Sequence, residues 1–125
     1  MVVMLCDPDK SFDGPSKCLD YNKILSLYSD NKEFNIIHDP QHHEIQINKH
    51  VIERTFTIKH IDSGLMREVK HYSFLKWIDK DSVDENKIAE DNLIELVDLM
   101  VKHREHTSTP IMTHCSAGVG RSGTT

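Results

Sequence analysis

The sequence is short of the features that would place it in several classes of protein. It has no run approaching the ~20 apolar residues that a membrane-spanning helix needs, so we expect no membrane association. Its three cysteines are an odd number and lie far apart, which is typical of reduced thiols in the cytoplasm rather than of a disulfide framework. Lysine and arginine total 15 against 20 acidic residues, and the net charge of −5 argues against a nucleic-acid partner.

Metal-ligand spacing is also missing, although histidine is abundant. Nine histidines are scattered along the chain, and His42-His43 is the nearest approach to a pair of ligands. We therefore expect no metal site. The length of 125 residues is room for one domain, which we expect to be a monomer, and 38% hydrophobic with 28% charged residues is typical of a globular protein.

The most informative stretch reads HCSAGVGRSG, from His114 to Gly123. Small residues separate Cys115 from Arg121, six positions later. This spacing lets one turn of backbone curl around a tetrahedral oxyanion with its N–H groups pointing inward, and the glycines permit the backbone angles that such a turn needs. A helix opening at Ser122 would direct its N-terminus at the same anion. We call residues 116–121 the phosphate cradle: Ser116, Ala117, Gly118, Val119, Gly120 and Arg121.

Cys115 is predicted to be a nucleophile. A free thiol has a pKa of about 8.5, but N–H donors, a helix N-terminus and a cation lower it to roughly 3.5–7.5. The resulting thiolate would attack phosphorus and form a cysteinyl phosphate, while Arg121 forks two hydrogen bonds onto the phosphoryl oxygens. Ser122 would tune the sulfur and His114 would order the loop. No metal or cofactor is required, because the backbone and Arg121 supply the positive field. The alternative is a buried structural cysteine beside a glycine-rich turn.

The first half of the chain shows strand patterns. Residues 2–5 form an apolar run that indicates a buried strand. Residues 45–47 alternate, and a longer strand follows in which one face carries Ile52, Arg54, Phe56 and Ile58. Asp62-Ser63-Gly64 has turn chemistry, so Met66 to Phe74 should return antiparallel as a hairpin.

The second half predicts a helix and a strand before the cradle. From Asn86 to about His106, apolar residues recur at helical spacing, which indicates an amphipathic helix of about five turns. We expect its buried stripe to be Leu93, Leu96, Val97, Met100 and Val101. Pro110 to Thr113 should then form a short strand that leads into the cradle. Strand, cradle and helix follow the order in which α/β folds place ligands at strand ends.

Residues Ile111 to Thr124 resemble the signature of cysteine-dependent protein tyrosine phosphatases. Further patches occur in the order used by the tyrosine-specific branch of that family: Val2-Val3-Met4-Leu5, Lys17-Cys18 with Tyr21, Arg54-Thr55-Phe56, His71-Tyr72 and Trp77-Ile78-Asp79. The resemblance implies an α/β fold in which helices flank a central twisted mixed sheet. It also implies that residues 1–125 are a partial catalytic domain, truncated at both its N- and C-terminal ends.

The resemblance implies that Asp79 is the general acid, on a segment for which Trp77 is the hinge. The alternative is that Asp79 is one surface carboxylate among several. The family carries proline where this chain has Ile78, and usually glycine where it has Asp81. Phe12 stands where the family has a glutamate that orients the signature arginine. These departures put the rate of turnover in doubt rather than phosphate binding.

We therefore expect a protein tyrosine phosphatase that hydrolyses phosphotyrosine in proteins through a cysteinyl-phosphate intermediate. Two alternatives remain open: a pseudophosphatase that binds phosphotyrosine proteins without efficient turnover, and a dual-specificity phosphatase that also accepts phosphoserine. The pattern of departures resembles phosphatases of the bracoviruses. We expect a cytoplasmic location, which would be the host-cell cytoplasm if the protein is viral.

Overall fold

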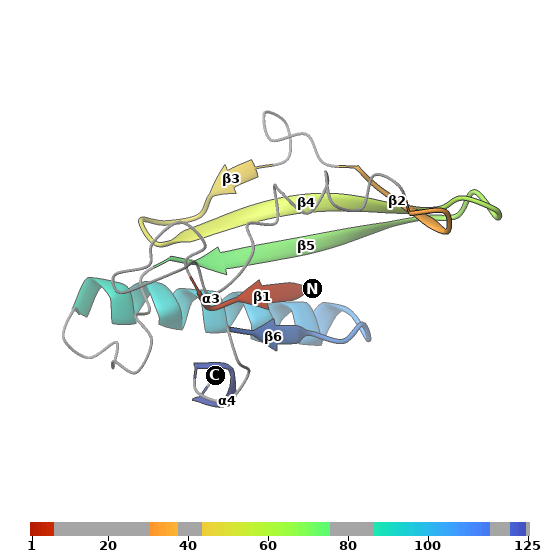
Figure 1. Cartoon of the computed structure of the whole chain (residues 1–125). Coiled ribbons are helices and arrows are strands. Elements are labelled where there is room, and N and C mark those ends of the chain that lie inside the picture. The colour runs from red at the N-terminus through yellow and green to blue at the C-terminus, as the bar shows by residue number, and fades with distance from the viewer. Residues whose placement is uncertain (7–30, 38–43, 76–86, 116–120, 125) are drawn as a thin grey trace.

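The computed structural model describes residues 1–6, 31–37, 44–75, 87–115 and 121–124 (Figure 1). The elements in chain order are β1 (Val2–Met4), β2 (Phe34–Ile37), β3 (Glu44–Gln46), β4 (Val51–His60), β5 (Met66–Phe74), α3 (Lys87–His106), β6 (Met112–His114) and α4 (Arg121–Thr124).

A mixed sheet forms the centre of the molecule. Its strand order is β2-β4-β5-β1-β6, and β3 pairs with β4 outside this path. The pairs that involve β4 are antiparallel, whereas β1 runs parallel to both β5 and β6. The first strand of the chain therefore lies between two strands that come much later in the sequence, and it joins the hairpin to the strand that precedes Cys115.

The predicted hairpin is confirmed. The two long strands β4 and β5 are joined by a tight turn in which Gly64 has a φ of 71°. The backbone N–H of Gly64 donates to the carbonyl of His60, and that of His60 donates to Leu65, both at 2.9 Å. A positive φ costs glycine little because it has no Cβ. The register that follows places Arg54 opposite His71 and Glu53 opposite Tyr72.

One face of the sheet carries the core that contains Cys115. Side chains alternate between the faces of a strand, so the register places Val3, Val51, Tyr72 and Phe74 on the same face. They form one buried cluster, which also includes Leu5, Leu96 of α3 and Cys115. The helix α3 thus packs against this face of the sheet, and in the view of Figure 1 it passes behind β1 and β6.

The predicted helix is confirmed in its bounds but not in its buried stripe. Leu96 is fully buried, and Leu93, Leu99 and Met100 pack partly against the core. Val97 and Val101 are instead 36% and 49% exposed, so assigning them to the core was wrong. Each lies about 100° around the helix from the residue before it, and the buried face is centred on Leu96 and Met100.

The strand before Cys115 is confirmed, with a shift in its bounds. It was expected from Pro110 to Thr113, but β6 covers Met112–His114. Proline has no N–H to contribute to a strand ladder; the carbonyl of Pro110 instead accepts from the amino terminus at 3.4 Å. The ladder begins where the N–H of Met112 donates to the carbonyl of Met1 at 3.0 Å.

Candidate active site

The nucleophile predicted from the sequence lies at the carboxyl end of β6. Cys115 directly follows the strand and is only 7% exposed, within the cluster that includes Leu5, Tyr72 and Leu96. The N–H of Leu5 donates to the carbonyl of His114 at 2.8 Å, which extends the β1–β6 pairing up to the cysteine. The chain therefore presents Cys115 from the end of a paired strand, the edge at which α/β folds bind ligands.

A short helix begins at the other end of the cradle. The backbone of Arg121 opens α4, one residue before the helix start at Ser122 that the sequence predicts. Strand and helix are thus in the expected order around the cysteine. Residues 116–120, the remainder of the cradle, lie outside the described residues, and so the grip of the cradle on an anion stays a prediction.

The two residues expected to support the cysteine are both described. The Nδ1–H of His114 donates to the carbonyl of Cys115 at 3.3 Å, so the ring contacts the backbone of the predicted nucleophile. The Oγ of Ser122 is buried and has no hydrogen-bond partner among the described residues. The role of Ser122 in tuning the sulfur therefore stays a prediction.

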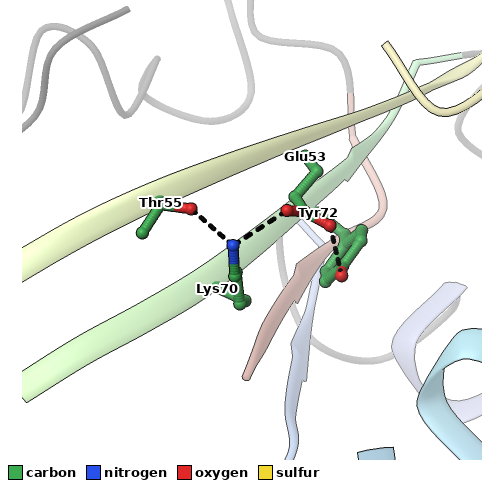
Figure 2. Close-up of polar contacts among 4 residues, drawn as sticks. All are labelled: Glu53, Thr55, Lys70 and Tyr72. Atoms are coloured by element: carbon green, nitrogen blue, oxygen red, sulfur yellow. Dashed lines mark hydrogen bonds and ion pairs between the residues drawn. The ribbon is translucent and has the colours of Figure 1, made fainter. Parts of the chain in front are cut away.

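The aromatic ring of Tyr72 lies in the same buried cluster as Cys115, and a polar network orients it (Figure 2). The Tyr72 hydroxyl donates to Oε2 of Glu53 at 2.6 Å, and Lys70 donates to the other oxygen of Glu53 at 3.0 Å. Lys70 also donates to Oγ1 of Thr55 at 2.8 Å. Burial, the hydrogen bond and the charge of Glu53 all raise the pKa of Tyr72 above its ordinary value. Tyr72 therefore stays protonated and donates.

On the opposite face, the structure brings together two of the patches quoted from the sequence. Arg54 is buried and donates to Oε2 of Glu44 and to Oγ of Ser73, both at 2.9 Å. The ring of His71 is also buried and meets Phe56 edge-on at 5.8 Å between centroids. These patches are separated in sequence, and they are neighbours because Arg54 pairs with His71 across β4 and β5.

The general-acid segment is described only at its two ends. Trp77, Ile78 and Asp79 lie outside the described residues, as do Phe12, Cys18 and Asp81. Before the segment, the chain is described up to Leu75, and after it from the start of α3. The role of Asp79 therefore stays a prediction. Cys6 is buried one residue beyond Leu5.

Sequence reasoning missed Glu53 and His50. Glu53 could have been found from the hairpin register, because the turn at Gly64 sets it opposite Tyr72. His50 is 3% exposed and contacts residues from two distant parts of the chain, and no local pattern signals it. Within the described ranges, no group of three or more His, Cys, Asp or Glu side chains is placed to hold a metal ion. Nor does the described part of the chain contain a helix long and apolar enough to cross a membrane.

Comparison with known proteins agrees with the fold. The family model of protein-tyrosine phosphatases matches residues 1–125. The chain belongs to the protein-tyrosine phosphatase family.

Curated relatives are similar over large parts of the chain. Human tyrosine-protein phosphatase non-receptor type 13 is 37% identical over 76 residues, which are 61% of this chain and 3% of that protein. The rat non-receptor type 20 enzyme is 32% identical over 111 residues, or 88% of this chain and 24% of the relative. The chain therefore spans about a quarter or less of the length of these relatives.

Solved structures share the fold. A structure of PTPN18 determined for its fingerprint on distinct HER2 tyrosine phosphorylation sites aligns with a TM-score of 0.73 at 20% identity. The catalytic domain of human protein tyrosine phosphatase non-receptor type 18 aligns with a TM-score of 0.68 at 22% identity. Each alignment covers 98% of this chain and 40% of the solved chain. The α/β fold with a mixed sheet, predicted from the sequence, is confirmed.

Proposed function

We propose that this chain carries the nucleophile of a protein tyrosine phosphatase that hydrolyses phosphotyrosine in proteins. The observation that carries the proposal is the placement of Cys115, buried at the end of β6, with a helix that starts at Arg121. The match of the whole chain to the family supports it. Phosphorylated HER2 peptides are bound in two of the similar PTPN18 structures, which supports phosphotyrosine proteins as the substrate class.

The reaction has two steps. The Cys115 thiolate attacks phosphorus, the bond from phosphorus to the tyrosine oxygen breaks, and Asp79 gives its proton to the departing oxygen. Arg121 and the cradle amides stabilise the charge on the phosphoryl oxygens. Asp79, now a carboxylate, then takes a proton from water, which attacks the cysteinyl phosphate. Inorganic phosphate leaves and the thiolate is regenerated.

Phosphate release from a phosphotyrosine peptide tests the proposal, with Cys115→Ser compared with Cys6→Ser. Cys6 is also buried, so the second variant makes the same substitution at a cysteine outside the site. We expect Cys115→Ser to reduce turnover to the background rate, because the hydroxyl is not ionised near neutral pH, and Cys6→Ser to retain it. Equal losses in the two variants would contradict the assignment of the nucleophile.

The same measurement separates the two alternatives. A pseudophosphatase, the alternative suggested by the departure at Ile78, would bind the peptide without releasing phosphate, and the similarity to tyrosine-protein phosphatases does not favour it. A dual-specificity enzyme would also release phosphate from a phosphoserine peptide, which we expect to be inert here.

The proposal also covers where in the cell the protein acts and which group of phosphatases it resembles. Relatives named non-receptor phosphatases support a cytoplasmic location, in which the protein would act as a monomer. The bracovirus resemblance, with action in host-cell cytoplasm, rests on the departures at Phe12, Ile78 and Asp81, and the genomic neighbourhood of the gene would test it.

A further inference from the structure

The connection between α3 and β6 is irregular and exposed. Residues 107–110 lie outside any helix or strand, and all four are exposed. They read Thr107-Ser108-Thr109-Pro110, so three consecutive residues of this connection carry a hydroxyl group. The connection follows α3 and precedes the strand that leads to Cys115 (Figure 1). A group attached to it would therefore lie between the helix and that strand.

Thr109 differs from its two neighbours in the residue that follows it. Of the four prolines in the chain, only Pro110 follows a serine or a threonine. A proline restricts the residue before it to an extended conformation, and protein kinases bind the residues around the acceptor hydroxyl in an extended form. Proline also has no N–H that would need a partner in the kinase site. Thr109 is thus the kind of acceptor that a proline-directed protein kinase recognises.

The hydroxyl of Thr109 belongs to a short chain of hydrogen bonds at the end of α3. The Nε2–H of His103 donates to Oγ1 of Thr109 at 2.9 Å, and the Thr109 hydroxyl donates to Oγ1 of Thr107 at 2.9 Å. The Thr107 hydroxyl donates in turn to the carbonyl of His103 at 2.9 Å. This arrangement places the His103 ring beside the oxygen to which a phosphoryl group would be joined.

The last turn of α3 offers a positive environment for a phosphate. Its basic residues are His103, Arg104 and His106. The C-terminal end of a helix repels anions through its free carbonyls. Here the carbonyl of His103 also accepts from the N–H of Thr107 at 3.0 Å. The carbonyl of Lys102 accepts from the Nδ1–H of His106 at 2.8 Å. Two of the carbonyls that would repel a phosphate therefore already have donors.

We propose that Thr109 is a phosphorylation site for a proline-directed protein kinase and that the resulting phosphate binds the ring of His103. In the reaction, Oγ1 of Thr109 attacks the γ-phosphorus of ATP, the bond from that phosphorus to the β–γ bridging oxygen breaks, and ADP leaves. The hydroxyl proton goes to a base of the kinase. The phosphate carries about −1.5 to −2 charge at neutral pH, so the His103 N–H bonds to it more strongly than to the hydroxyl.

The expected consequence is a firmer attachment of the connection to α3. A phosphate placed opposite basic side chains orders the segment that carries it. Because the connection leads into β6, the modification acts on the approach to Cys115 without altering a residue of the cradle. The inference does not depend on the proposed function, since a separate kinase adds the phosphate.

Labelling of the full protein tests the site. The protein is incubated with ATP and a purified proline-directed protein kinase, and phosphorylated peptides are mapped by mass spectrometry. We expect phosphate at Thr109, none at this position in Thr109→Val, and unchanged labelling in Ser108→Ala, which removes the neighbouring hydroxyl. Pro110→Ala should lower the labelling rate about tenfold or more, the order of discrimination that one side chain gives. Valine has the shape of threonine and position 109 is exposed, so this variant should fold.

Hydrogen exchange of the phosphorylated protein tests the role of His103. The N–H of Thr107 should exchange about tenfold more slowly after phosphorylation, as expected when one more charge-assisted hydrogen bond holds the connection. His103→Gln should remove most of this slowing. His106→Gln is the matched control, because the ring of His106 bonds to the carbonyl of Lys102 instead, and it should keep the slowing.

Absence of phosphate at Thr109 in the folded parent, while the kinase labels a peptide that is its established substrate, would overturn the site, and so would labelling at Ser108 or Thr107 in its place. Equal labelling of Pro110→Ala and the parent would overturn the class of kinase. Unchanged exchange at Thr107, or equal slowing in His103→Gln and the parent, would refute the binding of the phosphate by His103.

Discussion

At the scale of single residues, the apolar cluster around Cys115 contains a polar atom, the hydroxyl of Tyr72, that needs a hydrogen-bond partner. Tyr72 contributes its ring to that cluster and its hydroxyl to Glu53, whose second oxygen binds Lys70. Because a buried hydroxyl without a partner is costly, Glu53 allows a tyrosine in the cluster that contains Cys115.

Tyr72 predicts a dependence of stability on pH. Its pKa is raised in the folded protein, so the native state holds a proton that the unfolded state loses above pH ~10. The stabilisation is therefore complete below about pH 10 and is lost as the pH rises further, by up to ~1.4 kcal/mol per pH unit. Urea unfolding between about pH 8 and 11 should show this fall.

The control is Tyr72→Phe, which removes the titrating group. Its unfolding free energy should fall less steeply above pH ~10 than that of the parent. At neutral pH it should be about 1.5–3 kcal/mol less stable, the usual worth of a hydrogen bond to a charged group. Parallel pH profiles for the two proteins would refute the account.

At the scale of elements, the β4–β5 hairpin sets the register on which both sides of the site depend. Its turn places Glu53 opposite Tyr72 on one face and Arg54 opposite His71 on the other. A slip of one residue would move each side chain to the opposite face. The turn at Gly64 thus decides on which face of the sheet Glu53 and Arg54 lie, ten or more residues away along the chain.

Gly64→Ala tests the turn. A Cβ at this position would meet nothing within 4 Å, so the cost is one of backbone conformation at a φ of +71° rather than of collision. We expect a loss of about 1–2 kcal/mol for alanine and a smaller loss for Gly64→Asn, because asparagine adopts this region more readily. Thermal or urea unfolding measures both, and equal losses would contradict the conformational explanation.

At the scale of the whole molecule, Leu96 is the one fully buried side chain among those described in α3, at residues 90–106. Leu96 reaches the cluster that holds Cys115, Phe74 and Val51, while Asn92 and Glu95 meet the turn that carries His50. Apolar packing therefore supplies the attachment of the helix, and polar contacts set its position along the sheet.

Leu96→Ala should cost about 2–5 kcal/mol, the range for removing a buried leucine, because it leaves a cavity beneath the helix. Val97→Ala, one position along, should cost well under that, since Val97 is 36% exposed. Denaturant unfolding of the two variants checks the buried face of α3. Similar losses of stability in the two variants would show that Val97 is also part of the buried face of α3, as expected from the sequence.

Local chemistry explains which features the sequence predicted. The hairpin turn, the bounds of α3 and the strand before Cys115 follow from glycine conformation, helical periodicity and a run of apolar residues, each of which acts over a few positions. Cys115 was predicted to be the nucleophile for the same reason. Its spacing from Arg121 is that of a short turn whose own backbone N–H groups can bind an anion.

Only the tertiary structure decided which distant residues meet. It inserted β1 between β5 and β6, turned Leu96 rather than Val97 toward the sheet, and placed His50 against both Leu75 and Asn92. These contacts depend on strand order and on the packing of α3 over one face, which are properties of the whole chain. The sequence by itself predicted Cys115 as the nucleophile and determined the elements that flank it, since those need only neighbouring residues, and folding determined the residues that surround them.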